Sequence, residues 1–285
     1  MKSTLEQLDI RGLQTSFLET NRSAKETILF LHGFPDSAHA WDGLIEKLGK
    51  NYHCIAPFAR GLNESPHNNQ KDRLTLDSQM LDLLEILRAT GAMQKNIHIL
   101  SHDLGAVPAW KLSHLLGKKA ESLTVINGLS LKQFLRRLKN PHQLIKSWYI
   151  WLLQVPGIME TFMKKNPDYI LKKAATMGGR DLKTFDREAL KGFELYRQYL
   201  KETPTEIKSS TRIKAKVLSI NSAEDAFLLP TTLEELERDC ENCEARILQG
   251  KHWIHHENPE LVAGIISNFI GSKNAKSKFT IEMGL

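Results

Sequence analysis

The sequence predicts an open α/β fold, with a mostly parallel sheet and helices on both faces. Short apolar runs bounded by turn residues alternate along the chain with stretches of helical periodicity, which is typical of parallel strands joined by helices. This alternation stops once, between residues 131 and 212, where one helical stretch follows another. We therefore expect an α/β frame that is interrupted by a helical insertion.

Seven segments are predicted to be strands, because they are short and apolar like the buried central strands of a parallel sheet. They are residues 13–19, 27–31, 53–56, 97–100, 122–126, 216–220 and 245–248. Four segments carry apolar residues at close to the 3.6-residue spacing of a helix. They are residues 75–90, 107–116, 233–239 and 260–270, the last opened by Pro259.

The helical insertion predicts a cap domain, with breaks expected at Pro141, Pro156-Gly157, Gly178-Gly179 and Pro204. The expected division is a first part of the core at 1–130, the cap at 131–212, the second part of the core at 213–272 and a flexible tail at 273–285. The tail is expected because these last residues are polar and contain several lysines.

Composition excludes several classes of protein. The chain has 285 residues, of which 41% are hydrophobic and 25% charged, as in a globular protein rather than a disordered one. No apolar run reaches the roughly 18–20 residues of a membrane span, and the first residues carry no recognisable secretion signal. The three cysteines, Cys54, Cys240 and Cys243, are too few for a disulfide framework, so we expect a cytoplasmic protein.

Positive charge is concentrated in the expected cap. The whole chain has a formal charge of +6, whereas residues 131–212 contain 17 Lys and Arg against eight Asp and Glu, a balance of +9. Such a segment can be a solvated lysine-rich surface, or it can attract an anionic substrate, an anionic lipid or a nucleic acid. No zinc-finger spacing or aromatic RNA-binding pattern accompanies it, so no nucleic-acid partner is expected.

The most informative segment is residues 96–110, in which a strand leads through Ser101-His102-Asp103-Leu104-Gly105 into a helix. Small residues on either side of a central nucleophile are typical of a tight strand-to-helix turn called a nucleophile elbow, and Asp103 occupies the central position here. Such a turn strains the central residue and projects its side chain from the end of the sheet. The alternative is that Asp103 only caps the following helix.

An aspartate at this position restricts the chemistry. A carboxylate with a pKa of about 3.9 is ionised at neutral pH and needs no base before it attacks. Attack on an acyl carbon would form a high-energy anhydride, whereas attack on a saturated carbon forms an alkyl ester that water can cleave. Asp103 therefore indicates epoxides or alkyl halides as substrates.

The other parts of such a site follow predicted strands. The run His32-Gly33-Phe34-Pro35 follows the strand at 27–31, so the backbone N–H groups of Phe34 and Leu104 are expected to form an oxyanion hole. Asp225 follows the strand at 216–220 as the expected acid, with Glu224 as its neighbouring competitor.

His252 follows the last predicted strand and is the expected base, so the order of nucleophile, acid and base is that of an elbow hydrolase. His255 and His256 are its rivals, expected at the surface of a helix entrance. A zinc site built from these histidines with Cys240 and Cys243 would lack a second paired cysteine motif, so no metal is expected.

These motifs, HGFP, SHDLG, AEDAFLLP and KHWIHHENPE, resemble in order those of the α/β-hydrolase fold epoxide hydrolases, over about residues 25–271. Haloalkane and haloacid dehalogenases share the same elbow, acid and histidine. The run SWYIWLLQVPG is similar to the first cap-tyrosine segment of the epoxide hydrolases, which implies that Tyr149 and Tyr196 hold the epoxide oxygen, with Tyr199 as the rival of Tyr196.

The chain departs from the family pattern at three places, one of which is the run Pro57-Phe58-Ala59-Arg60-Gly61 in place of a more usual Pro-Asp-x-Arg-Gly. Leu104 stands where epoxide hydrolases commonly have Trp, and Lys251 stands where they have Gly before the histidine. Dehalogenases have Trp or Arg at the position of Leu104, and the haloalkane enzymes have Asn at that of Phe34. The epoxide interpretation is therefore preferred, and Lys251 would lower the pKa of His252 if its side chain pointed inward.

The resemblance implies an epoxide hydrolase that forms a vicinal diol without a cofactor or metal. We expect a small-molecule epoxide as the substrate, lipophilic or, given the basic segment, anionic, and a monomer or homodimer. The alternatives are a hydrolytic dehalogenase that acts on an alkyl halide or haloacid, and a non-catalytic ligand-binding protein that has kept the fold.

Overall fold

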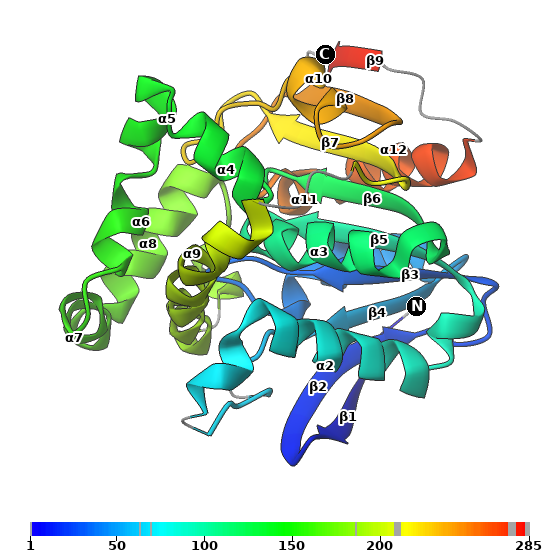
Figure 1. The fold of residues 1–285 in the computed structure, drawn as a ribbon, viewed down its shortest axis with the longest axis horizontal. Helices are drawn as coiled ribbons and strands as arrows, with labels where there is room; N and C mark the ends of the chain where they lie inside the picture. The colour runs from blue at the N-terminus through cyan, green and yellow to red at the C-terminus, as the bar shows by residue number, and fades with distance from the viewer. Residues whose placement is uncertain are drawn as a thin grey trace.

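The computed structural model describes residues 2–62, 64–68, 70–185, 187–207, 212–272 and 278–282. A nine-stranded sheet runs through the centre of the molecule in the order β1-β2-β4-β3-β5-β6-β7-β8-β9 (Figure 1). β2 pairs antiparallel with β1 and β4, and all other neighbours are parallel. The strands are β1 (Thr4–Ile10), β2 (Leu13–Thr20), β3 (Glu26–Leu31), β4 (His53–Pro57), β5 (Asn96–His102), β6 (Ala120–Ile126), β7 (Lys216–Ser222), β8 (Cys243–Leu248) and β9 (Lys278–Glu282).

Helices cover both faces of the sheet, as the sequence predicts. Leu29 and Leu31 of β3 pack with α2 and α3 on one face, whereas Ile28 and Phe30 pack with α1 and α12 on the other. The helices of the frame are α1 (Asp42–Leu48), α2 (Leu76–Ala89), α3 (Ala106–Leu116), α10 (Leu233–Glu237), α11 (Ile254–Glu257) and α12 (Pro259–Gly271). Short 3₁₀ helices occupy Ala38–Trp41, Lys71–Leu74, Ala92–Gln94, Asp103–Gly105, Gly117–Lys119, Leu182–Thr184 and Arg187–Gly192. The predicted α/β fold is confirmed.

Both edges of the sheet differ from the prediction. Each of the seven predicted strands is present, but the sequence analysis missed β1 and β9, which have little apolar surface to bury. β9 lies within the segment expected to be a flexible tail, where it pairs in parallel with β8. The main-chain hydrogen bonds of an edge strand leave only a weak signal in its side chains.

Between β6 and β7 the described residues form six α-helices that lie to one side of the sheet (Figure 1). They are α4 (Leu131–Arg137), α5 (Pro141–Lys146), α6 (Trp148–Leu153), α7 (Ile158–Lys165), α8 (Pro167–Gly178) and α9 (Phe193–Ile207). An apolar cluster that includes Leu153, Leu171 and Phe193 joins most of these helices to Phe34 and Leu104 of the frame. The break expected at Pro204 is wrong: Pro204 stands in the last turn of α9, where its missing N–H removes a single hydrogen bond.

Two buried arginines of this helical insertion bind the frame. Arg137 of α4 donates to the carboxylate of Glu235 and to the carbonyl oxygens of Leu229 and Pro230. Arg180, just after α8, pairs with Asp36 of the loop that follows β3. These contacts hold the helices over the ends of the central strands.

Candidate active site

Asp103 occupies a strained turn between β5 and α3. Its φ is +50°, in the left-handed region that non-glycine residues seldom adopt. Gly105 makes the turn possible, because a Cβ at this position would overlap the carbonyl oxygens of Leu31 and His32. The geometry is that of a nucleophile elbow rather than of a simple helix cap.

The structure brings the predicted carboxylates and histidine together around Asp103. The Phe34 N–H donates to Oδ1 of Asp103 at 2.9 Å, and Nε2 of His252 lies 3.5 Å from Oδ2. On the other side of the ring, Nδ1 of His252 donates to Oδ2 of Asp225 at 2.7 Å. The Leu104 N–H belongs to the first turn of the helical segment, where N–H groups have no intrahelical acceptor.

Asp225 is itself held in place by backbone donors. Its Oδ1 accepts hydrogen bonds from the N–H groups of Phe227 and Leu228 at 2.7 and 3.0 Å. Its competitor Glu224 is exposed and accepts from the side chain of Gln249 instead. Asp225 is thus the carboxylate that orients the His252 ring.

The charges of the two carboxylates set the protonation of His252. Burial lowers the pKa of His252, but the negative charges of Asp225 and Asp103 outweigh burial and raise it to about 10. For Asp103, burial raises the pKa, but the hydrogen bond and the charge of His252 outweigh burial and bring the pKa below its usual value. The resting site therefore holds an imidazolium between two carboxylates. The side chain of Lys251 lies against Gly179, and the charges that set the pKa of His252 are those of Asp225 and Asp103.

The sequence predicts His255 at the surface, but the structure places it in the interior. Its side chain is buried, with its ring 4.5 Å from that of His102 and 4.9 Å from that of Trp41. Burial keeps the pKa of His255 well below its usual value and lowers that of the half-buried His256 to about 3. Both rings are neutral packing residues, because α11 lies against the frame.

Two phenols face the carboxylate from the helical insertion. Tyr149 of α6 and Tyr196 of α9 pack edge to face, with ring centroids 6.4 Å apart, and both line one cavity with Asp103. Burial and the Asp103 charge raise the pKa of each phenol, so both remain protonated donors. The hydroxyl of the rival Tyr199 donates instead to Oε1 of Gln79 at 2.7 Å.

The cavity shared by Asp103 and the two phenols is small, and its other walls are apolar apart from Tyr199. Its volume is about 60 Å³, and Leu104, Ile150 and Leu228 are among its walls. This space holds only a few atoms, so a larger substrate requires the helices above Asp103 to move apart.

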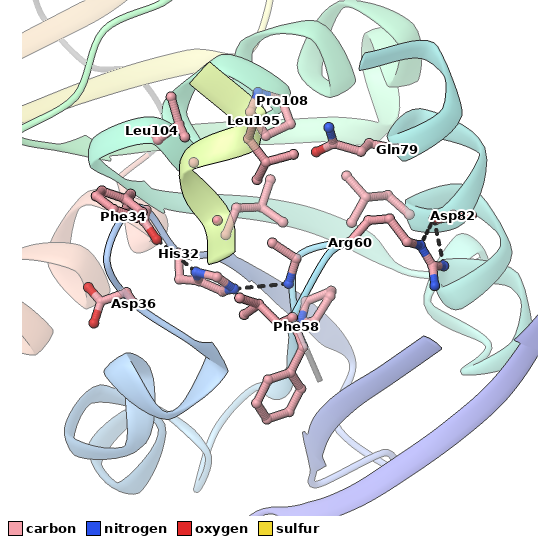
Figure 2. Close-up of a pocket in the computed structure, with 18 of the residues that line it drawn as sticks. His32, Phe34, Asp36, Phe58, Arg60, Gln79, Asp82, Leu104, Pro108 and Leu195 are labelled. Atoms are coloured by element: carbon pink, nitrogen blue, oxygen red, sulfur yellow. Dashed lines mark hydrogen bonds and ion pairs between the residues drawn. The ribbon is translucent and has the colours of Figure 1, made fainter. Parts of the chain in front are cut away.

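A second cavity of about 60 Å³ lies behind Phe34 and Leu104 (Figure 2). Figure 2 shows the ring of His32 in its wall, where Nε2 accepts a hydrogen bond of 3.0 Å from the N–H of Ala59. Nδ1 of the same ring lies 3.0 Å from the Gly33 carbonyl oxygen. Burial lowers the pKa of His32 to about 4, so this neutral ring fixes the loop that carries the Phe34 N–H.

Sequence reasoning missed a second group that supports the site. Asp36 accepts a hydrogen bond of 2.8 Å from the Trp253 indole and pairs with Arg180. Trp253 packs edge to face against His252 at 4.8 Å between ring centroids. Asp36, which directly follows the HGFP run, is the sequence feature that could have indicated this group. Its partner Arg180 is 144 residues away in sequence, so the pairing could not be predicted.

Comparisons with known proteins agree with this architecture. The family model described as "alpha/beta hydrolase fold" matches residues 26–169, so the chain belongs to the α/β-hydrolase family. It is a hydrolase of that superfamily.

Its relatives include proteins named for epoxide hydrolysis. Epoxide hydrolase 2 of Caenorhabditis elegans is 24% identical over 92% of this chain and 79% of its own length. The AB hydrolase superfamily protein YfhM of Bacillus subtilis is 27% identical over 91% and 98%. The crystal structure of a Bacillus megaterium epoxide hydrolase with an inhibitor superposes with a TM-score of 0.80 at 20% identity, covering 94% of this chain and all of that one.

The surroundings of Gly105 and Gly264 predict that replacement by alanine has opposite effects on stability at the two positions. Gly105→Ala forces a Cβ into backbone atoms that cannot move aside, so we expect a loss of at least about 3 kcal/mol in the free energy of unfolding. Gly264→Ala in α12 meets no atom within 4 Å and should gain about 0.8–1 kcal/mol from helix propensity. Urea unfolding measures both. A Gly105→Ala variant as stable as the wild type would contradict the tight turn.

Proposed function

We propose that this hydrolase converts an epoxide to a vicinal diol through an alkyl ester on Asp103. The observation that carries the proposal is a single cavity with a strained carboxylate on one wall and two protonated phenols on another. The carboxylate supplies a nucleophile for a saturated carbon, and the phenols supply donors for the oxygen that remains attached to the substrate. The names of the relatives support the same substrate class.

In the first step, Oδ2 of Asp103 attacks an epoxide carbon and the carbon–oxygen bond of the ring breaks. Oδ1 accepts from the Phe34 N–H, so it is the oxygen that becomes the ester carbonyl. The ring oxygen accepts hydrogen bonds from Tyr149 and Tyr196 and takes a proton from one of them. The products of this step are a hydroxyalkyl ester and a phenolate.

Formation of the ester changes the protonation of His252. The charge of Asp103 disappears, and with it part of the cause that raises the pKa of the imidazole. The proton that His252 releases restores the phenol. The neutral His252 is then a general base for water, and Asp225 stabilises the imidazolium that forms again.

In the second step, water attacks the ester carbonyl and the oxyanion receives hydrogen bonds from the Phe34 and Leu104 N–H groups. The bond between the carbonyl carbon and the alkyl oxygen breaks, and that oxygen takes a proton from His252. The remaining carboxyl proton of Asp103 returns to His252. The site regains an imidazolium between two carboxylates and releases the diol.

The site does not favour the dehalogenase alternative, because it lacks the side-chain donors that bind a departing halide in dehalogenases. Leu104 and Phe34 offer no side-chain donor. The side-chain donors among the described residues of the cavity are the phenols of Tyr149, Tyr196 and Tyr199, and that of Tyr199 donates to Gln79. An epoxide needs the phenols of Tyr149 and Tyr196, because its oxygen stays bound to carbon.

A His252→Gln variant should accumulate the ester, because attack proceeds without a base and hydrolysis does not. With styrene oxide we expect the intact protein mass to rise by one substrate mass, and peptide mapping to locate the adduct on Asp103. The Asp103→Ala variant is the control and should gain no mass. An adduct on another residue, or none while the wild type forms diol, would contradict the proposal.

Replacement of each phenol should slow ester formation. Tyr149→Phe and Tyr196→Phe are expected to reduce its single-turnover rate roughly 10- to 100-fold, because each removes a donor to the developing alkoxide. Tyr199→Phe is the matched control, since its hydroxyl donates to Gln79 and should leave the rate within about twofold. A larger effect at Tyr199 than at Tyr196 would reverse the assignment.

Ester formation should be insensitive to pH over a wide range. Asp103 has a lowered pKa and stays ionised, His252 keeps its proton below about pH 10, and the raised pKa of each phenol preserves both donors. We therefore expect a constant rapid-quench rate between about pH 5 and 9. A rate that follows an ionisation near the ordinary histidine value of about 6.5 would contradict this charge arrangement.

A further inference from the structure

The outer helices of the insertion expose an unusual amount of apolar surface. Among the described residues, eight of the fourteen exposed large hydrophobic side chains lie between Leu144 and Tyr169. We define the cap face by the six that the argument uses, namely Ile145, Trp148, Trp151, Ile158, Phe162 and Tyr169. We propose that the cap face binds the surface of an anionic phospholipid bilayer.

The cap face belongs to the helices farthest from the sheet. Its side chains come from α5, α6, α7 and α8, and α5, α6 and α7 form the outer edge of the molecule in Figure 1. Ile145 is 70% exposed and Trp148 63%, values that packing within the chain would have reduced. Phe162 and Tyr169 meet edge to face at 5.9 Å, which joins α7 to α8 on this surface.

The exposed tryptophans are not part of the catalytic cavity. α6 directs Tyr149 and Ile150 into that cavity, whereas Trp148 and Trp151 stand in solvent one turn apart. Two tryptophans exposed on the same side of a helix favour a membrane interface, because the indole ring is amphipathic and gains free energy between water and the acyl chains. The outward side of α6 therefore has a use that the reaction does not explain.

Positive charge accompanies these aromatic side chains along the chain. Residues 139–173 contain five exposed lysines that pair with no carboxylate of the described residues. They are Lys139, Lys164, Lys165, Lys172 and Lys173. The two acidic residues of this stretch are each neutralised by an arginine. Aromatic and aliphatic side chains mixed with lysine are the composition that binds an anionic lipid surface.

The same charge argues against a second copy of the chain as the occupant. A symmetric dimer through the cap face would bring its lysines against the identical lysines of the partner, and like charges across an interface oppose association. A bilayer with anionic headgroups is complementary to both the charge and the apolar side chains. The binding is peripheral, since no helix in the described part of the chain could reach across a bilayer.

Co-sedimentation of the full chain with vesicles tests the proposal. We expect the wild type to bind phosphatidylcholine vesicles that contain phosphatidylserine, and to bind pure phosphatidylcholine vesicles more weakly. Lys164→Gln with Lys165→Gln should weaken binding about 25-fold, because each lysine near an anionic surface contributes about fivefold. Trp148→Ser with Trp151→Ser should weaken binding at least about tenfold to vesicles that contain phosphatidylserine.

Matched controls lie on exposed positions outside the cap face. Lys118→Gln with Lys119→Gln makes the same charge change beside α3, and Leu115→Ser removes a side chain that is 56% exposed. Both controls should bind like the wild type, and thermal unfolding should show that all variants fold. The proposal would be overturned by absence of binding to the vesicles that contain phosphatidylserine, by equal losses in the controls, or by a dimer that Trp148→Ser with Trp151→Ser dissociates. An Asp103→Ala variant should still bind, so the result does not depend on the proposed reaction.

Discussion

The structure of the site depends on one carboxylate held between a backbone donor and an imidazolium. β3 and β5 are neighbours in register, with Leu31 opposite Ser101, so the loop after β3 and the turn after β5 meet at the same edge of the sheet. This register brings the Phe34 N–H to Asp103 Oδ1. The positive φ of Asp103 is sustained by the close approach at Gly105, where a side chain would overlap the neighbouring backbone.

Charge balance links this carboxylate to the histidine. His252 has Asp103 on one ring nitrogen and Asp225 on the other, and both carboxylates raise its pKa. Loss of one negative charge leaves the imidazole less basic, so a single covalent event at Asp103 would alter the proton affinity of the group that acts next. The neighbouring histidines, His102 and His255, are buried and neutral, and add no competing cation.

The sequence predicts those parts of the site that follow strands. Asp103, Asp225 and His252 each lie shortly after the end of a buried apolar run, and the parallel sheet brings such positions together. The edge strands β1 and β9 could not be predicted, because they bury little apolar surface. The position of His255 depends on how α11 packs against the frame, which local spacing does not determine.

Contacts between elements that are distant in the chain also could not be predicted from the sequence. The pairing of Arg180 with Asp36 depends on how α8 lies over the frame, and the hydrogen bond from Tyr199 to Gln79 depends on the rotation of α9. The rotation of α6 decides that Tyr149 faces the cavity while Trp148 faces solvent. Periodicity alone predicted helices here without their orientation.

The most direct test of the account is a single turnover in ¹⁸O-labelled water, with enzyme in excess over the epoxide. A covalent ester transfers an Asp103 oxygen to the diol and leaves an oxygen from water in the carboxylate. We therefore expect ¹⁸O in the peptide that contains Asp103 and none in the diol. Label in the diol with an unlabelled Asp103 peptide would mean that water attacks the epoxide directly, and would contradict Asp103 as the nucleophile.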